Sequence, residues 1–376
     1  MKYYIIAGEA SGDLHASNLM KAILQEDEDA QFRFWGGDLM QAVGGTLVKH
    51  YRDLAFMGFL EVVMNLRTIT RNLKFCKKDI EEYAPDAIIY VDYPGFNLRI
   101  AKWAKAKGYQ NHFYISPQIW AWKEGRIKDI KRDIDHMYVI LPFEKDFYEK
   151  KHNFPVHFVG HPLIDAISER NQVVPEDFKK EFDLDERKII ALLPGSRKQE
   201  IQKMLDVMLS ITEDFPDYQF VVAGAPSQDK EFYAPYLGNK QVHLVMNRTY
   251  DLLSLSSAAL VTSGTATLET ALFKVPEVVC YKGGRISYEI AKRVINLDFI
   301  SLVNLIMEKE VVKELIQHNF NKKSLKAALK NVLKEYPRAK LFIDYWDLEK
   351  KLGGRGASTK TAQLIVESIK SQEKNA

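Results

Sequence analysis

Short runs of consecutive apolar residues alternate with helical patterns along most of this 376-residue chain. The runs include YYIIA at 3–7, AIIYV at 87–91 and IIALL at 189–193, and an amphipathic segment follows each of them. An apolar run without polar alternation is typical of a strand buried on both faces of a parallel sheet. The pattern therefore predicts an α/β fold built from doubly wound, Rossmann-like sheets.

A polar segment around residues 160–187 interrupts this alternation of predicted strands and helices, which resumes after it. It predicts two α/β domains, the first covering residues 1–164 and the second residues 165–349, with the helical tail 350–376 packing back on the first. Parallel strands point their carboxyl ends at functional crevices, so two such domains that face each other would enclose a cleft. That arrangement suits an enzyme with two substrates, although a fold alone proves no reaction.

The composition excludes several classes of protein. The 53 basic and 50 acidic side chains leave a net charge of +3, which gives no reason to expect a nucleic-acid partner. No apolar run approaches the length of a membrane span and no signal peptide is visible, so any membrane contact should be peripheral. The two cysteines, Cys76 and Cys280, fit a reducing, cytoplasmic location without a structural disulfide.

Two motifs in the second domain sit where a strand runs into a helix. LLPGSR at 192–197 and TSGTATLE at 262–269 combine small turn residues with the free N–H groups of a helix start, which attract phosphate. Ordinary turns with capped helices are the alternative. Together the motifs predict a nucleotide-diphosphate site, with Arg197 on the phosphates and Glu269 on the ribose hydroxyls. Its residues are Gly195, Ser196, Arg197, Ser263, Gly264, Thr265 and Glu269.

In the first domain, YVDYPGFN at 90–97 places a carboxylate, Asp92, at the end of a buried strand. A buried carboxylate is unfavourable unless something uses it. Asp92 is therefore a candidate functional residue, and the alternative is a structural aspartate that caps the turn around Pro94.

Long motifs in this chain resemble the lipid-A-disaccharide synthase family. They are GEASGD, YVDYPGFN, SPQIWAW, LPFEKDFY, LLPGSR, TSGTATLE and SLVNL, in the family's order and near its spacing, and the resemblance runs from Ile6 to the final helix. It implies a GT-B glycosyltransferase that moves 2,3-diacylglucosamine from UDP-2,3-diacylglucosamine to 2,3-diacylglucosamine 1-phosphate. The implied products are a β-1,6-linked disaccharide 1-phosphate and UDP, formed with inversion and without a metal or other cofactor.

The resemblance also assigns residue roles. It implies that Asp92 is the general base that takes the proton of the acceptor hydroxyl, with His161 of the GHP motif as the runner-up. It adds Asn304 of SLVNL to the nucleotide site. The family usually has a second acidic residue at the position that Gly95 occupies in this chain. Gly95 cannot take over any role that this second carboxylate plays in the family.

Further candidates for the acceptor side of the site follow the other strands of the first domain. They are Glu9, Ser11, Ser116, Trp120 and Trp122, with His161 beside them. The two tryptophans could lie against a sugar ring or an acyl chain, and core packing is their alternative role. Lys123 or Arg126 could meet the acceptor phosphate.

The segment from Phe56 to Lys78 combines apolar residues at helical spacing with a basic end. It predicts a peripheral contact with the cytoplasmic face of the inner membrane of a Gram-negative bacterium, and an ordinary core-facing helix is the alternative. The membrane candidates are Leu60, Val63, Leu66, Arg67 and Arg71. The sequence leaves monomer and homodimer both open.

Two other functions remain open at this point. A UDP-N-acetylglucosamine 2-epimerase of the same fold would use a similar UDP site without a lipid acceptor. A non-catalytic nucleotide-sugar-binding protein at the membrane would have no need of Asp92 as a base.

Overall fold

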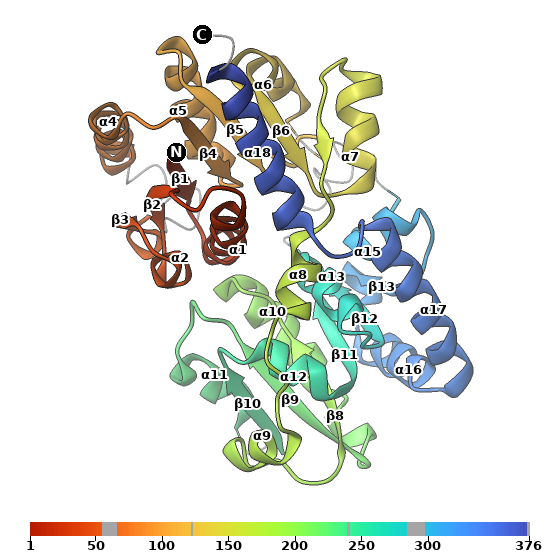
Figure 1. Ribbon diagram of the computed structural model, residues 1–376. Helices are drawn as coiled ribbons and strands as arrows, with labels where there is room; N and C mark the ends of the chain where they lie inside the picture. The colour runs from red at the N-terminus through yellow and green to blue at the C-terminus, as the bar shows by residue number, and fades with distance from the viewer. Residues whose placement is uncertain (55–65, 122, 239–240, 284–297, 374–376) are drawn as a thin grey trace. The chain divides into compact units, whose positions relative to one another are not determined.

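The computed structural model describes residues 1–54, 66–121, 123–238, 241–283 and 298–373 (Figure 1). The chain forms two compact units, Met1–Ser168 with Leu352–Ala376, and Glu169–Lys351. The sequence placed the two boundaries at residues 164 and 349. Each unit holds one sheet in which every strand pair is parallel, so the predicted α/β class is confirmed.

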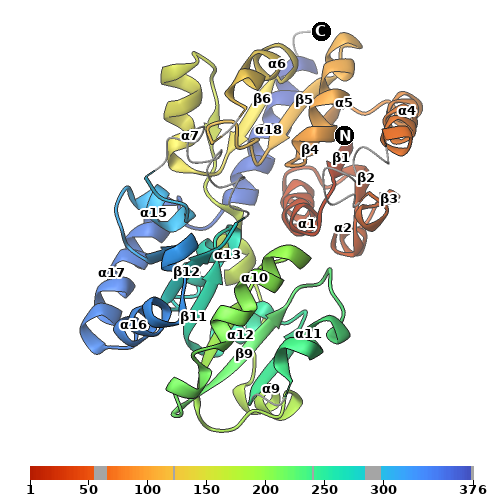
Figure 2. The same cartoon turned by 180° about the vertical axis from the view of Figure 1, so that it is seen from behind.

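The first unit contains a seven-stranded sheet in the order β3-β2-β1-β4-β5-β6-β7. In that order the strands are Thr46–His50, Gln31–Gly36, Lys2–Ala7, Ala87–Val91, Gln110–Tyr114, His136–Val139 and His157–Phe158. Its helices are α1 (Ala10–Glu26), α2 (Asp38–Val43), α4 (Leu66–Tyr83), α5 (Pro94–Ala106), α6 (Ile127–Asp133), α7 (Pro142–Asp146), α8 (Pro162–Ser168) and α18 (Ala357–Glu373). Figure 2 shows the same unit from behind.

The second unit contains a six-stranded sheet in the order β10-β9-β8-β11-β12-β13. These strands are Val242–Met246, Tyr218–Gly224, Lys188–Leu193, Ser256–Thr262, Glu277–Tyr281 and Lys313–Ile316. Its helices are α9 (Pro175–Glu181), α10 (Lys198–Leu209), α11 (Lys230–Leu237), α12 (Thr249–Leu255), α13 (Thr265–Leu272), α15 (Leu302–Met307), α16 (Lys322–Val332) and α17 (Glu335–Lys351).

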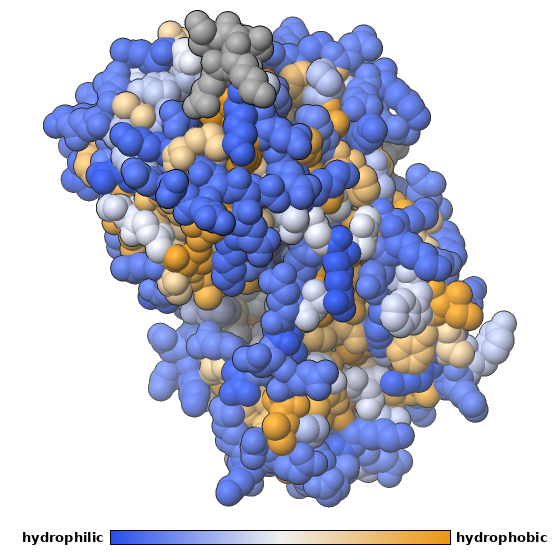
Figure 3. Space-filling view, viewed as in Figure 1, coloured by the Kyte–Doolittle hydropathy of each residue, from blue (hydrophilic) through white to orange (hydrophobic). Residues whose placement is uncertain are grey.

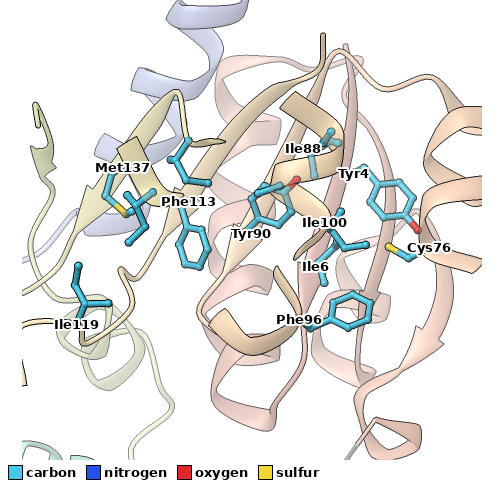
Figure 4. Packing of buried hydrophobic residues seen from close by; sticks show 14 of the residues in the cluster. Tyr4, Ile6, Cys76, Ile88, Tyr90, Phe96, Ile100, Phe113, Ile119 and Met137 are labelled. Atoms are coloured by element: carbon cyan, nitrogen blue, oxygen red, sulfur yellow. The ribbon is translucent and has the colours of Figure 1, made fainter. Parts of the chain in front are cut away.

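The core of the first unit lies on the central strands, whose side chains are fully buried (Figure 4). Tyr4 of β1 and Tyr90 of β4 lie in one layer with Ile100 of α5. The Tyr4 hydroxyl donates to Asp79 of α4 at 2.7 Å and accepts from Trp35 Nε1 at 2.9 Å. Burying one large apolar side chain stabilises a fold by about 1.5–3 kcal/mol, so the ends of these strands are held rigidly.

The chain returns to the first unit through α18, which packs against α1. Ala362, Ile365 and Val366 of α18 are buried, and the Asp165 carboxylate accepts from the backbone N–H groups of Gly356 and Ser358 at 2.7 and 3.1 Å. Both cysteines are free and buried. Among the residues that the structure describes, no helix is both long and apolar enough to span a bilayer.

Candidate active site

Two turns lie side by side where the central strands of the first sheet end. Strands β1 and β4 are paired with Ala7 opposite Val91, so the turn at Gly8–Glu9 lies beside the turn at Asp92–Tyr93. A Cβ atom on Gly8 would sit only 2.3 Å from Cδ1 of the Tyr93 ring. Glycine at position 8 therefore lets the two turns approach closely, which brings Glu9 near Asp92.

The backbone at Asp92 is held in an uncommon conformation. Asp92 and Tyr93 have φ angles of +46° and +50°, and such left-handed residues persist where their surroundings fix them. The Asp92 N–H donates to the carbonyl of Tyr114 on β5 at 3.0 Å. The buried Asn97 amide donates to the Asp92 carbonyl at 2.7 Å and to the Ile6 carbonyl at 3.3 Å. These bonds place the Asp92 side chain at the carboxyl edge of the sheet.

The electrostatics of Asp92 suit a proton acceptor. Burial, together with a smaller effect from the negative charge of Glu9, raises the pKa of its carboxyl from 3.8 to about 6, while a backbone hydrogen bond from Tyr93 opposes the shift. A general base works best when its pKa lies near the pH at which it operates. Asp92 is thus ionised at neutral pH and still basic enough to take a proton.

Ser116, after β5, is buried and already bonded. Its hydroxyl donates to Oε1 of Glu144 at 2.6 Å, and the backbone N–H of Leu141 donates to the other oxygen of Glu144 at 2.9 Å. Burial raises the pKa of Glu144 to about 7, against these hydrogen bonds. Ser116 therefore anchors the loop that follows β5.

Trp120 lies further along that loop, partly buried, with its ring edge-on to Phe143 at a centroid distance of 4.8 Å. Trp122 lies outside the described residues. Lys123 follows with a φ of +59°, and Arg126 ends a short 3-10 turn.

The candidates near α1 separate into exposed and buried groups. Glu9 and Ser11 are exposed at the start of the helix. His161 is buried, its Nδ1 accepts from the backbone N–H of Leu163 at 3.2 Å, and burial together with the neighbouring His15 lowers its pKa to about 3. Such an imidazole accepts protons weakly at neutral pH, so this geometry favours Asp92 over His161 as the base.

In the second unit, the two predicted phosphate motifs lie on neighbouring strands. Strands β8 and β11 are paired with Leu193 opposite Val261. Gly195 has a φ of +107°, and a Cβ atom there would lie 3.5 Å from Cγ2 of Thr262. The starts of α10 and α13 therefore lie at the same edge of the sheet, where their N–H groups favour an anion.

Arg197 is the cation at this edge. Its side chain is 74% exposed, and its Nη1 lies 3.6 Å from Oε1 of Glu200. The carbonyl of Ser196 accepts from the Ser227 hydroxyl at 2.8 Å, which ties the loop to the one after β9. A fixed loop thus presents a solvent-exposed guanidinium, which matches the geometry of phosphate oxygens.

Glu269 lies on α13, one turn beyond the exposed residues Gly264 and Thr265. Its Oε1 accepts from the hydroxyl of Tyr250 on α12 at 3.1 Å, and burial raises its pKa despite that bond. One carboxylate oxygen is thus positioned by the protein. Ser263, in contrast, already donates to the Ile300 carbonyl at 2.9 Å.

The predicted contact of Asn304 with the nucleotide stays a prediction, and the structure shows the bonds that its side chain makes within the fold. Its side chain is fully buried, with Oδ1 accepting from the N–H groups of Val311 and Val312 at 2.8 and 2.9 Å. Its amide nitrogen donates to the Val312 carbonyl and to Glu314, each at 2.9 Å. With these bonds made, Asn304 fixes the segment around α15 from inside the fold.

The sequence analysis missed three residues whose hydrogen bonds hold the segments at the carboxyl edges of the two sheets. Asn97 bonds the Asp92 turn, Tyr250 bonds Glu269, and Asp13 accepts from the N–H groups of Gly37, Leu39 and Met40 at 2.8–3.1 Å. Asp13 stood in the GEASGD motif and could have been found there. Tyr250 carried no signal, because YDLLSL reads only as a helix.

The membrane candidates are only partly described. Leu60 and Val63 lie outside the described residues, and α4 begins at Leu66. Arg67 and Arg71 are exposed and, with Thr70 and Lys74, line a surface hollow of about 450 Å³. The opposite side of α4 carries buried Cys76 and Ile80, so the helix has both a core face and a basic surface.

Comparison with known proteins matches nearly the whole chain. A family model described as lipid-A-disaccharide synthetase matches residues 3–367. Curated lipid-A-disaccharide synthases from Geobacter metallireducens and Trichlorobacter lovleyi are 37% and 35% identical, each over 97% of this chain and 96–97% of their own length. The enzyme of that name from Coxiella burnetii is 38% identical over 84% of both chains.

Solved structures resemble the chain at low identity. A UDP co-structure of S. aureus MnaA has a TM-score of 0.70 at 14% identity, covering 99% of this chain and 97% of that one. UDP-GlcNAc 2-epimerase from Neisseria meningitidis, bound to UDP-GlcNAc, has a TM-score of 0.67 at 12% identity, covering 99% and 100%. These likenesses show the fold, which is the predicted GT-B class.

Proposed function

Because this chain belongs to the lipid-A-disaccharide synthetase family, as the family model over residues 3–367 shows, we propose how its residues perform that family's reaction. The chain is a glycosyltransferase. It transfers 2,3-diacylglucosamine from UDP-2,3-diacylglucosamine to 2,3-diacylglucosamine 1-phosphate, and releases UDP. The observation that carries the residue assignment is the basic, fixed carboxylate of Asp92 at the carboxyl edge of the first sheet.

In a single displacement, the acceptor's 6-hydroxyl attacks the anomeric carbon and UDP leaves from the opposite face. Asp92 takes the hydroxyl proton as the new bond forms. Its left-handed turn, bonded to Tyr114 and Asn97, keeps the carboxylate in place, so little reorganisation is needed during the step. Burial, and to a smaller extent the charge of Glu9, keeps the carboxylate basic by raising its pKa.

The leaving UDP develops negative charge on its diphosphate. In our proposal the N–H groups at the starts of α10 and α13, together with the Arg197 guanidinium, bind and stabilise that charge. Glu269 accepts hydrogen bonds from the ribose hydroxyls while Tyr250 holds its other side. Asn304 accepts from the N–H groups of Val311 and Val312 and contributes by fixing the segment around α15.

Mass spectrometry of the product tests this proposal. Incubation with the two diacyl substrates should give a disaccharide 1-phosphate that carries both sets of acyl chains. Incubation with either substrate alone should give none. Absence of the disaccharide from an enzyme that binds UDP would contradict the proposed reaction.

An epimerase reaction is the second candidate, because the likeness to UDP-GlcNAc 2-epimerases covers nearly the whole chain. At 12–14% identity this likeness supports only the shared fold. Incubation with UDP-N-acetylglucosamine alone separates the two, since an epimerase interconverts it and the proposed transferase leaves it unchanged.

Both lipid substrates would bring the enzyme to a bilayer. We propose that the exposed cations of α4 contact anionic headgroups at the cytoplasmic face of the inner membrane, where each nearby cation adds about 1 kcal/mol. Replacing Arg67 and Arg71 by glutamate should weaken binding to phosphatidylglycerol vesicles. Vesicle binding equal to that of the wild type would contradict this assignment.

A further inference from the structure

Helix α17 carries an unusual group of exposed apolar side chains. Six large apolar side chains are exposed in the part of the chain that the structure describes. Three of them lie on α17: Tyr336, Ile343 and Trp346, which are 81%, 64% and 56% exposed. We call these three residues the α17 patch. Figure 3 shows orange, apolar atoms among blue charged ones at the position of α17, on the right of the view.

The three side chains project from one side of the helix. Positions 336, 343 and 346 are separated by seven and three residues, the spacings at which side chains share a face. The opposite face is already used, because Leu341, Tyr345 and Leu348 are buried in the second unit. The α17 patch is therefore a second apolar face that the fold of this unit leaves uncovered.

Lysines surround the patch. The Lys274 ammonium lies 4.5 Å from the centroid of the Trp346 ring, while Lys340 and Lys350 are exposed on the same helix. The acids near them are exposed Glu335 beside Tyr336, Asp347, 3.6 Å from Lys350, and Glu349, which pairs with Lys274 at 2.5 Å. The neighbouring helix α16 carries four lysines and no acid, and two of them, Lys322 and Lys326, pair with Asp214.

We propose that the α17 patch is a membrane-docking surface that inserts Tyr336, Ile343 and Trp346 into the headgroup region of an anionic bilayer. Tyrosine and tryptophan are enriched at that depth, and flanking lysines pair with anionic headgroups. The proposal rests on the proposed function in one respect, because the lipid substrates are what bring this enzyme to a bilayer. It assigns a contact on the second unit, separate from the cations of α4.

The dimensions of the patch favour a bilayer over a second protein chain. The patch spans ten residues, a length of about 15 Å, whereas a coiled-coil seam needs three or four heptads. Three such side chains expose on the order of 400 Å², about half of what each partner buries in a stable interface. A lipid surface needs no such matching area.

The test is vesicle sedimentation of a triple variant, Tyr336→Gln, Ile343→Gln and Trp346→Gln. Because these side chains are exposed, the variant should fold normally, and a melting curve checks this. We expect its partition onto phosphatidylglycerol-containing vesicles to fall about tenfold, while transfer between detergent-dispersed substrates stays at the wild-type rate. Val174→Gln is the matched control, since Val174 is a comparably exposed apolar residue of the same unit, and it should bind vesicles normally.

Two results would overturn the proposal. One is that the triple variant binds vesicles as tightly as the wild type does, and that adding the three substitutions to an Arg67→Glu, Arg71→Glu protein also leaves its vesicle binding unchanged. The other is a wild-type dimer that the triple variant converts to a monomer, which would make the patch a protein interface. If the wild-type enzyme showed no transfer between detergent-dispersed substrates, that result would count against the proposed function. The vesicle experiment would still decide the role of the α17 patch.

Discussion

An Asp92→Asn variant should lose most of its transfer activity and at the same time become more stable at alkaline pH. The activity loss follows from the missing base, which typically contributes about 10²–10⁴ in rate. Asparagine has a similar shape and tolerates the left-handed backbone that the turn requires, where φ is +46°. The turn should therefore survive the substitution.

The gain in stability comes from the raised pKa of Asp92. Its folded value is about 6 against a reference of 3.8, so the folded state prefers the protonated carboxyl. The carboxyl's contribution to stability is fully present below pH 3.8 and is lost as the pH rises through about 6. At about 1.36 kcal/mol per pKa unit, the ionised carboxylate destabilises the fold by at most about 3 kcal/mol at pH 8. Asparagine removes that penalty.

Two measurements check this reasoning. Denaturation at pH 4 and pH 8 should show the variant gaining stability only at the higher pH. In the wild type, kcat/KM should rise with pH through about 6, so that its value at pH 5 is about a tenth of the plateau. Glu9→Gln should move this midpoint to lower pH, because the charge of Glu9 raises the pKa.

The reasoning would be refuted by an Asp92→Asn enzyme that keeps its rate within tenfold of the wild type. It would also be refuted if the variant were less stable than the wild type at pH 8, because the carboxylate would then be a structural cap.

Three further substitutions test other parts of the structure. Arg197→Ala should weaken UDP binding about 10- to 100-fold in a calorimetric titration, because a hydrogen bond to a charged group contributes roughly 1.5–3 kcal/mol, and unchanged affinity would exclude the diphosphate role. Gly8→Ala should lower kcat but leave UDP affinity intact, since the new Cβ would meet the Tyr93 ring at 2.3 Å, and a normal kcat would show that the ring moves without disturbing Asp92. Glu277 is fully buried, its carboxyl oxygens accept no hydrogen bond from the residues that the structure describes, and burial raises its pKa well above 4.5. The wild type should therefore lose stability as the pH rises above about 4.5, and Glu277→Gln should flatten this dependence in urea denaturation between pH 5 and 9; identical pH slopes would contradict the burial argument.

The strands could be predicted from the sequence because a single property, burial on both faces of the sheet, determines which residues they contain. A strand such as Ala87–Val91 is buried on both faces, so apolar character alone marks it. The turns that follow the strands were also readable, since glycine and a polar residue directly after an apolar run have few other uses. Asp92, Gly195 and Arg197 were named on that basis.

The hydrogen-bond partners of individual side chains could not be predicted in the same way. Asn304 had the right residue type for a ligand contact, but its amide bonds the backbone of Val311 and Val312. Tyr250 bonds Glu269 across 19 positions of sequence, and nothing local marks such a pair. The conformation at Asp92 also had no sequence signal, because its positive φ depends on hydrogen bonds from Asn97 and to Tyr114.

The position of α18 has a consequence for how the protein is made. Ribosomes synthesise a chain from its first residue to its last, so α1 leaves the ribosome more than 300 residues before α18. Until then the face of α1 that α18 covers lacks that helix. The second unit is contiguous and can complete its core earlier. The first unit to be translated is therefore the last to be finished, and the uncovered face of α1 is a surface that a nascent-chain chaperone could shield.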